Sequence, residues 1–260
     1  MSGGTGIRIL VTNDDGVSSP GILALAERLR EVGAVTIVAP AREVSGISHA
    51  LTVSAPVVYE RLAEHVFSVE GTPADCVNLA VRNLLPQPPE LVVSGINRGA
   101  NLGEDVTYSG TVAGAREGSM LGIAAFAVSL ATKFEADYSL AAEFSAHLAR
   151  TLETKKLPAG TFLNVNVPPG EIKGVCLTSH GHGNPQTEPT EAEKTASRFC
   201  SWLKGKLGGS ELNGLSDIRA VLDHLISVTP LHTDITNYGV MEELSSWGLT
   251  WNGRRREESG

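Results

Sequence analysis

Two adjacent acidic residues, Asp14 and Asp15, follow the strand-like run IRILVT (7–12) with only Asn13 between. Like charges this close repel each other, and burial raises the pKa of at least one of them. A cation between the two carboxylates offsets that cost. The pair therefore predicts a cation site at the end of the first strand, although an acidic pair before a glycine is also typical of a simple turn.

Polar residues follow two further strand-like runs in the same way. The run 35–40 leads into a loop with Ser45 and Gly46, and the run 90–95 leads into a loop with Asn97 and Asn101. The carboxyl ends of parallel strands share one edge of a sheet, so these side chains are expected to converge with the two aspartates. A set of oxygen donors suits Mg²⁺, Mn²⁺ or Ca²⁺ rather than zinc, and the spacing is not that of an EF-hand.

The stretch Ser109-Gly110-Thr111 precedes a helical pattern around 112–121. Free backbone N–H groups and the positive end of a helix dipole bind anions, most often phosphate. The alternative is an ordinary helix cap. A cation site beside a phosphate site at one sheet edge predicts phosphate-ester chemistry.

Three other polar groups invite a functional reading that we do not favour. His49 lies four residues after Ser45, where it could act as an acid or a base. The two histidines of SHGHG, His180 and His182, are expected in a solvated loop. We expect Glu104 and Asp105 to be an acidic pair at a loop surface.

Buried strands alternate with helices through the first two-thirds of the chain. Strands are expected at 7–12, 35–40, 90–95, 123–130 and 161–168, with helices from Pro20 to Gly33, from Pro73 to about Leu85, around 112–121 and over 138–154. Two extended segments precede the second helix. This alternation predicts a parallel sheet with helices on both faces. Further along, 179–196 reads as a loop, 225–236 as a strand and 238–247 as a terminal helix.

Composition narrows the class of protein. The chain has 260 residues and a net charge of −8, and its only basic cluster is GRRR at 253–256, so binding to a nucleic-acid polymer is not expected. No apolar run is long enough to span a membrane, and no signal peptide is predicted. Cys76, Cys176 and Cys200 show no metal or disulfide spacing. A reducing cytoplasm is therefore the expected location.

Five long motifs resemble those of the SurE family, the stationary-phase survival proteins. They are ILVTNDDGVSSPGI, VAPAREVSGISHALTV, GTPADCVNLAV, LVVSGINRGANLGEDVTYSGTVAGAREG and SVTPLHTDIT, in this order. The resemblance covers about 7–170 and returns at 225–247. It implies one α/β domain, a Rossmann-like three-layer sandwich with a mostly parallel sheet. The core is expected at about 7–170, a C-terminal oligomerisation segment at about 171–250 and a tail at 251–260.

The resemblance also implies an activity and a site. The family's members are metal-dependent phosphatases of nucleoside 5′-monophosphates, and often of 3′-monophosphates, and they form homodimers or homotetramers that exchange C-terminal segments. Carried onto this chain, one divalent cation per subunit falls on Asp14, Asp15, Ser45 and Asn97. The phosphate contacts fall on Asn13, Gly46, Asn101, Ser109, Gly110 and Thr111. We expect hydrolysis in which Asp14 or Asp15 serves as the base.

One region departs from the family pattern. Between about 180 and 224 the chain lacks the usual Asp-Pro-Arg-Gly stretch, and only Trp202 and LSD (215–217) are similar to the family. Two other functions therefore stay open at this point. One is a sensor or scaffold that binds metal and nucleotide without turnover, and the other is a metal-dependent transferase that uses a nucleotide sugar.

Overall fold

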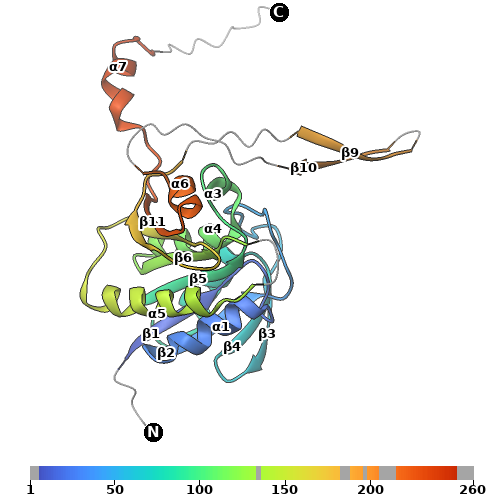
Figure 1. The fold of residues 1–260 in the computed structure, drawn as a ribbon, viewed down its shortest axis with the longest axis vertical. Coiled ribbons are helices and arrows are strands. Elements are labelled where there is room, and N and C mark those ends of the chain that lie inside the picture. The colour runs from blue at the N-terminus through green and yellow to red at the C-terminus, as the bar shows by residue number, and fades with distance from the viewer. Residues whose placement is uncertain (1–5, 133–135, 182–187, 196–197, 205–214, 251–260) are drawn as a thin grey trace, which may run out of the picture.

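A nine-stranded sheet forms the centre of the molecule in the order β3-β4-β2-β1-β5-β6-β7-β11-β8 (Figure 1). The computed structural model describes residues 6–132, 136–181, 188–195, 198–204 and 215–250. The strands of the sheet are β1 (Ile7–Thr12), β2 (Gly33–Pro40), β3 (Val58–Ala63), β4 (Val66–Glu70), β5 (Leu91–Arg98), β6 (Ala124–Leu130), β7 (Thr161–Val167), β8 (Gly174–Leu177) and β11 (Leu225–His232).

The middle of this sheet is parallel. β1 pairs in parallel with β2 and β5, and β6 pairs in parallel with β5 and β7. The antiparallel pairs lie further out, between β3 and β4 and between β7 and β11. The carboxyl ends of β1, β2 and β5 therefore open on one edge, as the sequence predicts.

Helices cover both faces of the sheet. The helical elements are α1 (Pro20–Leu29), α2 (Pro73–Leu79), a π-helical turn η1 (Ala80–Leu84), α3 (Asp105–Tyr108), α4 (Gly110–Met120), α5 (Ser139–Thr154), α6 (Asp217–Leu222), a 3₁₀ turn η2 (Tyr238–Val240) and α7 (Met241–Ser245). One buried apolar cluster joins α1 and α5 to one face, and a second joins α2 and α4 to the other. This confirms the predicted α/β sandwich with a mostly parallel sheet.

Several predicted boundaries are wrong. The first helix ends at Leu29, and Gly33 begins β2 instead of closing the helix. The predicted loop 179–196 contains a strand, β9 (Glu188–Thr195), which pairs antiparallel with β10 (Arg198–Lys204) in a separate ribbon. The segment EPTEAEKT offers no apolar alternation, so nothing in its pattern identifies it as a strand. The predicted helix 238–247 is the short turn η2 followed by α7.

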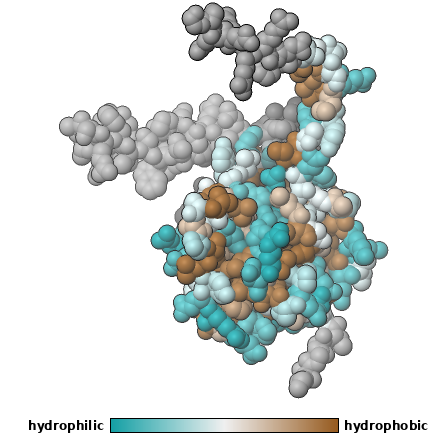
Figure 2. Space-filling view, turned by 180° about the vertical axis from the view of Figure 1, so that it is seen from behind, coloured by the Kyte–Doolittle hydropathy of each residue, from teal (hydrophilic) through white to brown (hydrophobic). Residues whose placement is uncertain are grey.

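The C-terminal segment 233–250 extends away from the body of the molecule and carries α7 (Figures 1 and 2). Five of its large apolar side chains are exposed by half or more, namely Ile235, Tyr238, Met241, Trp247 and Leu249. We call this segment the C-terminal arm. None of the helices in the described part of the chain is long and apolar enough to cross a bilayer.

Candidate active site at the carboxyl edge of the sheet

Asp14 and Asp15 lie where the central strand β1 ends. Asp14 is almost completely buried, and its carboxylate accepts a hydrogen bond from the Thr111 hydroxyl at the start of α4. Asp15 is half-buried, and its carboxylate accepts the backbone N–H of Arg98 at 3.1 Å. The two carboxylates are thus held by the end of β5 and by the first turn of α4, and both elements are expected at this edge from the sequence.

Burial dominates the electrostatics of this pair. Burial raises the pKa of Asp14 from 3.8 to about 6, the Thr111 hydroxyl opposes the rise, and the charge of Asp15 adds to it. Burial also raises the pKa of Asp15, with the backbone N–H of Arg98 acting in the opposite direction and Glu43 adding to the rise. The hydrogen bonds to both carboxylates, and the charge of Arg98 near Asp15, therefore offset the effect of burial only in part.

The donor set fits a hard divalent cation. Among the described residues, no Lys, Arg or His side chain forms an ion pair with Asp14 or Asp15. Nor do the described parts of the chain contain a cluster of three or more His, Cys, Asp or Glu side chains able to hold a metal. A cation at this pair would therefore depend on hydroxyl and amide oxygens for its other protein ligands, which suits Mg²⁺, Mn²⁺ or Ca²⁺.

Asn13 shapes the turn that carries the acids. Its side-chain amide donates to the Gly16 carbonyl oxygen at 3.0 Å and to the Ser19 hydroxyl at 2.7 Å. Ser19 stands at the N-cap position of α1, but its hydroxyl receives Asn13 and makes no cap hydrogen bond to the helix. Gly16 has a φ of +100°, a conformation that favours glycine. The side-chain oxygen of Asn13 is buried and has no hydrogen-bond partner among the residues that the structure describes.

The loop after β2 approaches the same edge. The backbone N–H of Val44 donates to the carbonyl oxygen of Asp14 at 2.8 Å. The next residue, Ser45, is exposed, and its hydroxyl donates to the Glu43 carboxylate at 2.8 Å. The backbone of this loop is therefore attached to the acidic pair, while the hydroxyl of Ser45 is engaged by Glu43. The role of Ser45 as a metal ligand stays a prediction. The phosphate contact expected for its neighbour Gly46, which is exposed with a φ of +73°, also stays a prediction.

The loop after β5 contributes two asparagines in different ways. The amide nitrogen of Asn97 donates to the Gly99 carbonyl oxygen at 3.0 Å, which leaves its side-chain oxygen as the atom to offer a cation. Asn101 is buried, and its side-chain amide donates to the Ser129 hydroxyl at 2.8 Å. Its backbone is fixed by Asn164 and Asn166 of β7 through three hydrogen bonds of 2.8–2.9 Å. Asn101 thus holds the loop in place.

The first turn of α4 packs directly on Asp14. Ser109 caps this helix, because its hydroxyl accepts the backbone N–H of Val112 at 3.0 Å. A Cβ atom on Gly110 would lie 2.9 Å from the Cβ of Asp14 and 3.0 Å from its Oδ2. Only glycine lets this turn approach the carboxylate so closely. The predicted cation site and the predicted phosphate turn are therefore in contact.

Four supporting residues were not singled out from the sequence. Asn164 and Asn166 hold the Asn101 loop, and their signal is the polar alternation in TFLNVNV within a buried strand. Glu117 of α4 accepts hydrogen bonds from His49 and Asn78. Asp217 accepts the backbone N–H groups of Gly103, Gly181 and Ile218. No local pattern marks Glu117, since its partners come from distant segments, and the only signal for Asp217 is its place in the family-like LSD stretch (215–217).

The remaining candidates lie in different places. His180 lies in a loop, as expected, but it is only partly exposed, and its ring lies 2.5 Å from the Gly103 carbonyl oxygen. His182 lies outside the described residues. Glu104 and Asp105 begin the short helix α3.

Fold and site together define a class: α/β proteins with a mostly parallel sheet whose carboxyl edge carries an acidic pair against the N-terminus of a helix. The family model for survival protein SurE matches residues 9–187. A 5′-nucleotidase SurE of Syntrophotalea carbinolica is 47% identical over 247 residues, covering 94% of this chain and 98% of the relative. One of Geobacter sulfurreducens is 48% identical over 253 residues, covering 94% of this chain and 95% of the relative.

A solved structure agrees with these sequence matches. The crystal structure of the SurE protein from Aquifex aeolicus superposes with a TM-score of 0.84 at 39% identity, covering 92% of this chain and 99% of that one. The chain belongs to the SurE family.

Proposed function

We propose that this protein is a metal-dependent phosphomonoesterase that hydrolyses nucleoside 5′-monophosphates, and 3′-monophosphates, to nucleoside and phosphate. The observation that carries the proposal is the contact between the buried acidic pair and the first turn of α4, where the Thr111 hydroxyl reaches Asp14. The relatives in Syntrophotalea and Geobacter are named 5′-nucleotidases, which supports a nucleotide as the substrate.

The residues proposed to hold one divalent cation per subunit are Asp14, Asp15, Ser45 and Asn97. Such a cation, Mg²⁺, Mn²⁺ or Ca²⁺, neutralises phosphoryl oxygens and acidifies water. For Ser45 to bind the cation, its hydroxyl must leave its hydrogen bond to Glu43 and turn toward the acidic pair. Asn97 already directs its amide nitrogen to Gly99 and keeps its oxygen available.

The chain's own groups supply binding and proton transfer. The backbone N–H of Gly110 and the hydroxyl of Ser109 are proposed to bind the phosphate, and Thr111 joins them when its hydroxyl turns from Asp14 to a phosphate oxygen. Gly46, Asn13 and Asn101 are proposed to shape the adjoining loops. One carboxylate of the pair takes the proton from the attacking water and returns it to the leaving oxygen, so that the ester P–O bond breaks as the new P–O bond forms and the nucleoside leaves as its alcohol. Gly110 keeps the substrate phosphate and Asp14 within reach of each other, because no side chain separates them.

The test uses the purified full-length protein with AMP and an aryl phosphate as substrates. Free phosphate should appear with Mn²⁺ and disappear with EDTA, and Asp15→Asn should lower turnover at least 100-fold without changing the circular dichroism spectrum. AMP bound tightly but not hydrolysed would identify a non-catalytic sensor and overturn the proposal. Release that is insensitive to EDTA would overturn the metal dependence.

We also propose that the protein is a homodimer, alone or as half of a homotetramer, in which the C-terminal arm packs on a second copy. The five exposed apolar side chains of the arm support this, because exposing a group of apolar side chains to water is unfavourable and such patches are typical of protein–protein interfaces. Light scattering should give at least twice the mass of one chain. The double variant Ile235→Ser/Trp247→Ser should shift the mass toward one chain. A monomeric wild type would overturn the proposal.

A reducing cytoplasm is the proposed location. The described cysteines, Cys76 and Cys176, are free, which is typical of proteins kept under reducing conditions. Fractionation of cells that produce the tagged protein tests this, and recovery outside the cytoplasmic fraction would contradict it.

A further inference from the structure

The loop after β2 carries the predicted metal ligand Ser45 without any helix or strand to hold it. Ser45, Gly46 and Ile47 are all exposed. A ligand on such a stretch costs conformational entropy when it binds, unless neighbouring contacts fix the backbone beforehand. The contacts on either side of this stretch therefore decide how well the site is formed.

The first of these contacts is at Ser48, which has a φ of +56°, an uncommon conformation for a residue other than glycine. Its hydroxyl donates to the Thr107 carbonyl oxygen at 2.7 Å, and its backbone N–H donates to the Tyr108 carbonyl oxygen at 2.9 Å. Both acceptors belong to α3, directly before the phosphate turn. The loop is thus bent back onto the site at this residue.

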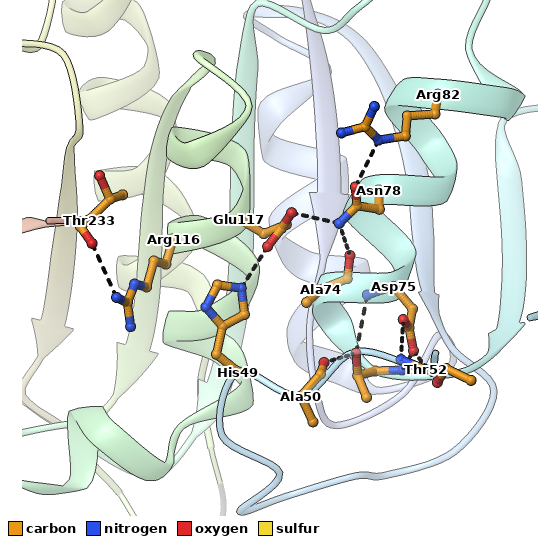
Figure 3. Close-up of polar contacts among 11 residues, drawn as sticks. His49, Ala50, Thr52, Ala74, Asp75, Asn78, Arg82, Arg116, Glu117 and Thr233 are labelled. Atoms are coloured by element: carbon orange, nitrogen blue, oxygen red, sulfur yellow. Dashed lines mark hydrogen bonds and ion pairs between the residues drawn. The ribbon is translucent and has the colours of Figure 1, made fainter. Parts of the chain in front are cut away.

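The second contact is a hydrogen bond between the loop and α4. Nε2 of His49 lies 2.7 Å from Oε2 of Glu117, whose side chain is 7% exposed (Figure 3). The other oxygen of Glu117 accepts the side-chain amide of Asn78 from α2 at 2.6 Å. The Asn78 oxygen in turn accepts Nε of Arg82 at 3.0 Å. A carboxylate this deeply buried needs partners on both oxygens, so His49 is an integral member of the network.

The third contact lies downstream. The Asp75 carboxylate accepts the backbone N–H of Thr52 at 2.9 Å and its hydroxyl at 2.6 Å, and the Thr72 hydroxyl donates to the Ala50 carbonyl oxygen at 2.7 Å (Figure 3). Ala50 and Thr52 are therefore attached to the first turn and N-cap of α2. Ser48 and His49 are the fixed residues that directly follow the exposed stretch with Ser45.

Helix α4 runs from the proposed site to the residue that holds His49. Gly110 and Glu117 are seven residues apart on the same helix, so they lie on one face, two turns from each other. The Cγ2 atom of Ile47 lies 3.0 Å from where a Cβ on Gly110 would stand, beside Asp14. The segment from Ile47 to His49 thus runs along this face, from the phosphate turn to Glu117.

We propose that the hydrogen bond between His49 and Glu117 is a positioning device that sets the affinity of the site for its divalent cation by fixing the loop that carries Ser45. His49 acts through the loop, and neither His49 nor Glu117 touches the substrate. The inference rests on the proposed function, because it assigns Ser45 to that same cation site. It differs from a role of His49 as general acid or base, which would change kcat and leave cation binding unchanged.

The test measures Mn²⁺ binding by isothermal titration calorimetry without substrate, next to KM and kcat for AMP. His49→Ala should raise the Kd for Mn²⁺ about tenfold, the loss typical when a group that orients a metal ligand is removed. The KM should rise with it, and kcat should change less than threefold. His49→Gln keeps a donor for Glu117 and should recover most of the affinity. His147→Ala, an exposed histidine on α5, is the matched control and should change nothing.

A double variant separates positioning from general destabilisation. Glu117→Gln removes the charge while keeping the side-chain shape, and His49→Ala/Glu117→Gln should bind Mn²⁺ no more weakly than the weaker single variant. Additive losses, or a Kd for His49→Ala within twofold of the wild type, would overturn the inference while leaving the proposed function intact. A fall in kcat at unchanged Kd would assign His49 to catalysis instead. A wild type that neither binds Mn²⁺ nor releases phosphate would reject the proposed function and this inference with it.

Discussion

The hydroxyl of Thr111 donates a hydrogen bond to the carboxylate of Asp14, which joins the first turn of α4 to the end of the central strand β1. A helix N-terminus normally attracts an anion from solution. Here a protein carboxylate, that of Asp14, occupies part of this anion-binding position. Burial raises its pKa, and the hydroxyl and backbone N–H of Thr111 lower it by a smaller amount. The anion-binding turn and the acidic pair are therefore two parts of one site.

The closeness of Gly110 to Asp14 predicts a specific sensitivity. In Gly110→Ala the new Cβ would stand 2.9 Å from the Asp14 Cβ and 3.0 Å from Ile47, so these groups must move by a few tenths of an ångström. We expect turnover of AMP to fall about tenfold, because a displacement of a few tenths of an ångström costs less than the roughly 100-fold loss typical of a 1 Å misplacement. Steady-state kinetics test this. Gly170→Ala has open space around the new Cβ but a φ of +81°, so it should lower stability and leave the turnover of the folded protein unchanged. Equal losses of turnover in the two folded variants would contradict the explanation.

The raised pKa of Asp14 predicts how stability depends on pH in the metal-free protein. The folded protein holds a proton up to about pH 6, whereas the unfolded chain releases it near 3.8. Folding is therefore favoured below this window, and the free energy of unfolding falls by about 3 kcal/mol as pH rises through it. Urea unfolding in EDTA near pH 4.5 and pH 7.5 should show about 2 kcal/mol of this fall, because pH 4.5 already lies above the pKa of the unfolded chain. Asp14→Asn should remove this part of the pH dependence, and an unaltered dependence would show that another group causes it.

The sequence predicted the parts of this protein that follow local rules. The strand ends that bring Asp14, Asn97 and the 45–46 loop to one edge follow from the parallel sheet. Helix starts were also found where local chemistry marks them, as at Thr72, whose hydroxyl and Asp75 form a capping box. Such rules involve residues within a few positions of each other.

The residues that hold the site together follow no such rule. Asp217 reaches Gly103 across 114 positions, and His49 reaches Glu117 across 68. Strand β9 has no apolar alternation to reveal it. For Ser45 the sequence predicts a position near the site. It does not predict the hydrogen bond to Glu43, because that bond depends on the conformation of an exposed loop. These features depend on tertiary contacts between distant segments, which cannot be predicted from local patterns in a single sequence.

The two buried asparagines of β7 should differ in their effects on stability. Asn166 exchanges two hydrogen bonds with the backbone of Asn101, whereas Asn164 donates one to a carbonyl oxygen that Asn166 also satisfies. Asn166→Ala leaves a buried N–H without a partner and should cost about 2 kcal/mol of unfolding free energy, with a raised KM for AMP. Asn164→Ala is the matched control on the same strand and should cost less in urea unfolding. The reverse order would contradict the assignment.

Asp217 predicts a link between the C-terminal part of the chain and the site. Its completely buried carboxylate accepts the backbone N–H of Gly103 at 3.0 Å, of Gly181 at 2.9 Å and of Ile218 at 2.7 Å. It thereby joins the first turn of α6 to the loop that follows β5. In Asp217→Ala the N–H groups of Gly103 and Gly181 lose their acceptor, and we expect a loss of about 2 kcal/mol or more.

Asp223 on the same helix provides the control for this prediction. It pairs with Arg219 at 2.8 Å, but both side chains are well exposed, so Asp223→Ala should change the free energy of unfolding by less than about 1 kcal/mol. Because Gly103 lies two residues after Asn101, Asp217→Ala should also raise the KM for AMP at temperatures where the variant is fully folded. Urea unfolding and steady-state kinetics measure the two effects. Equal stability losses in the two variants, or an unchanged KM in folded Asp217→Ala, would show that α6 does not support the substrate loop.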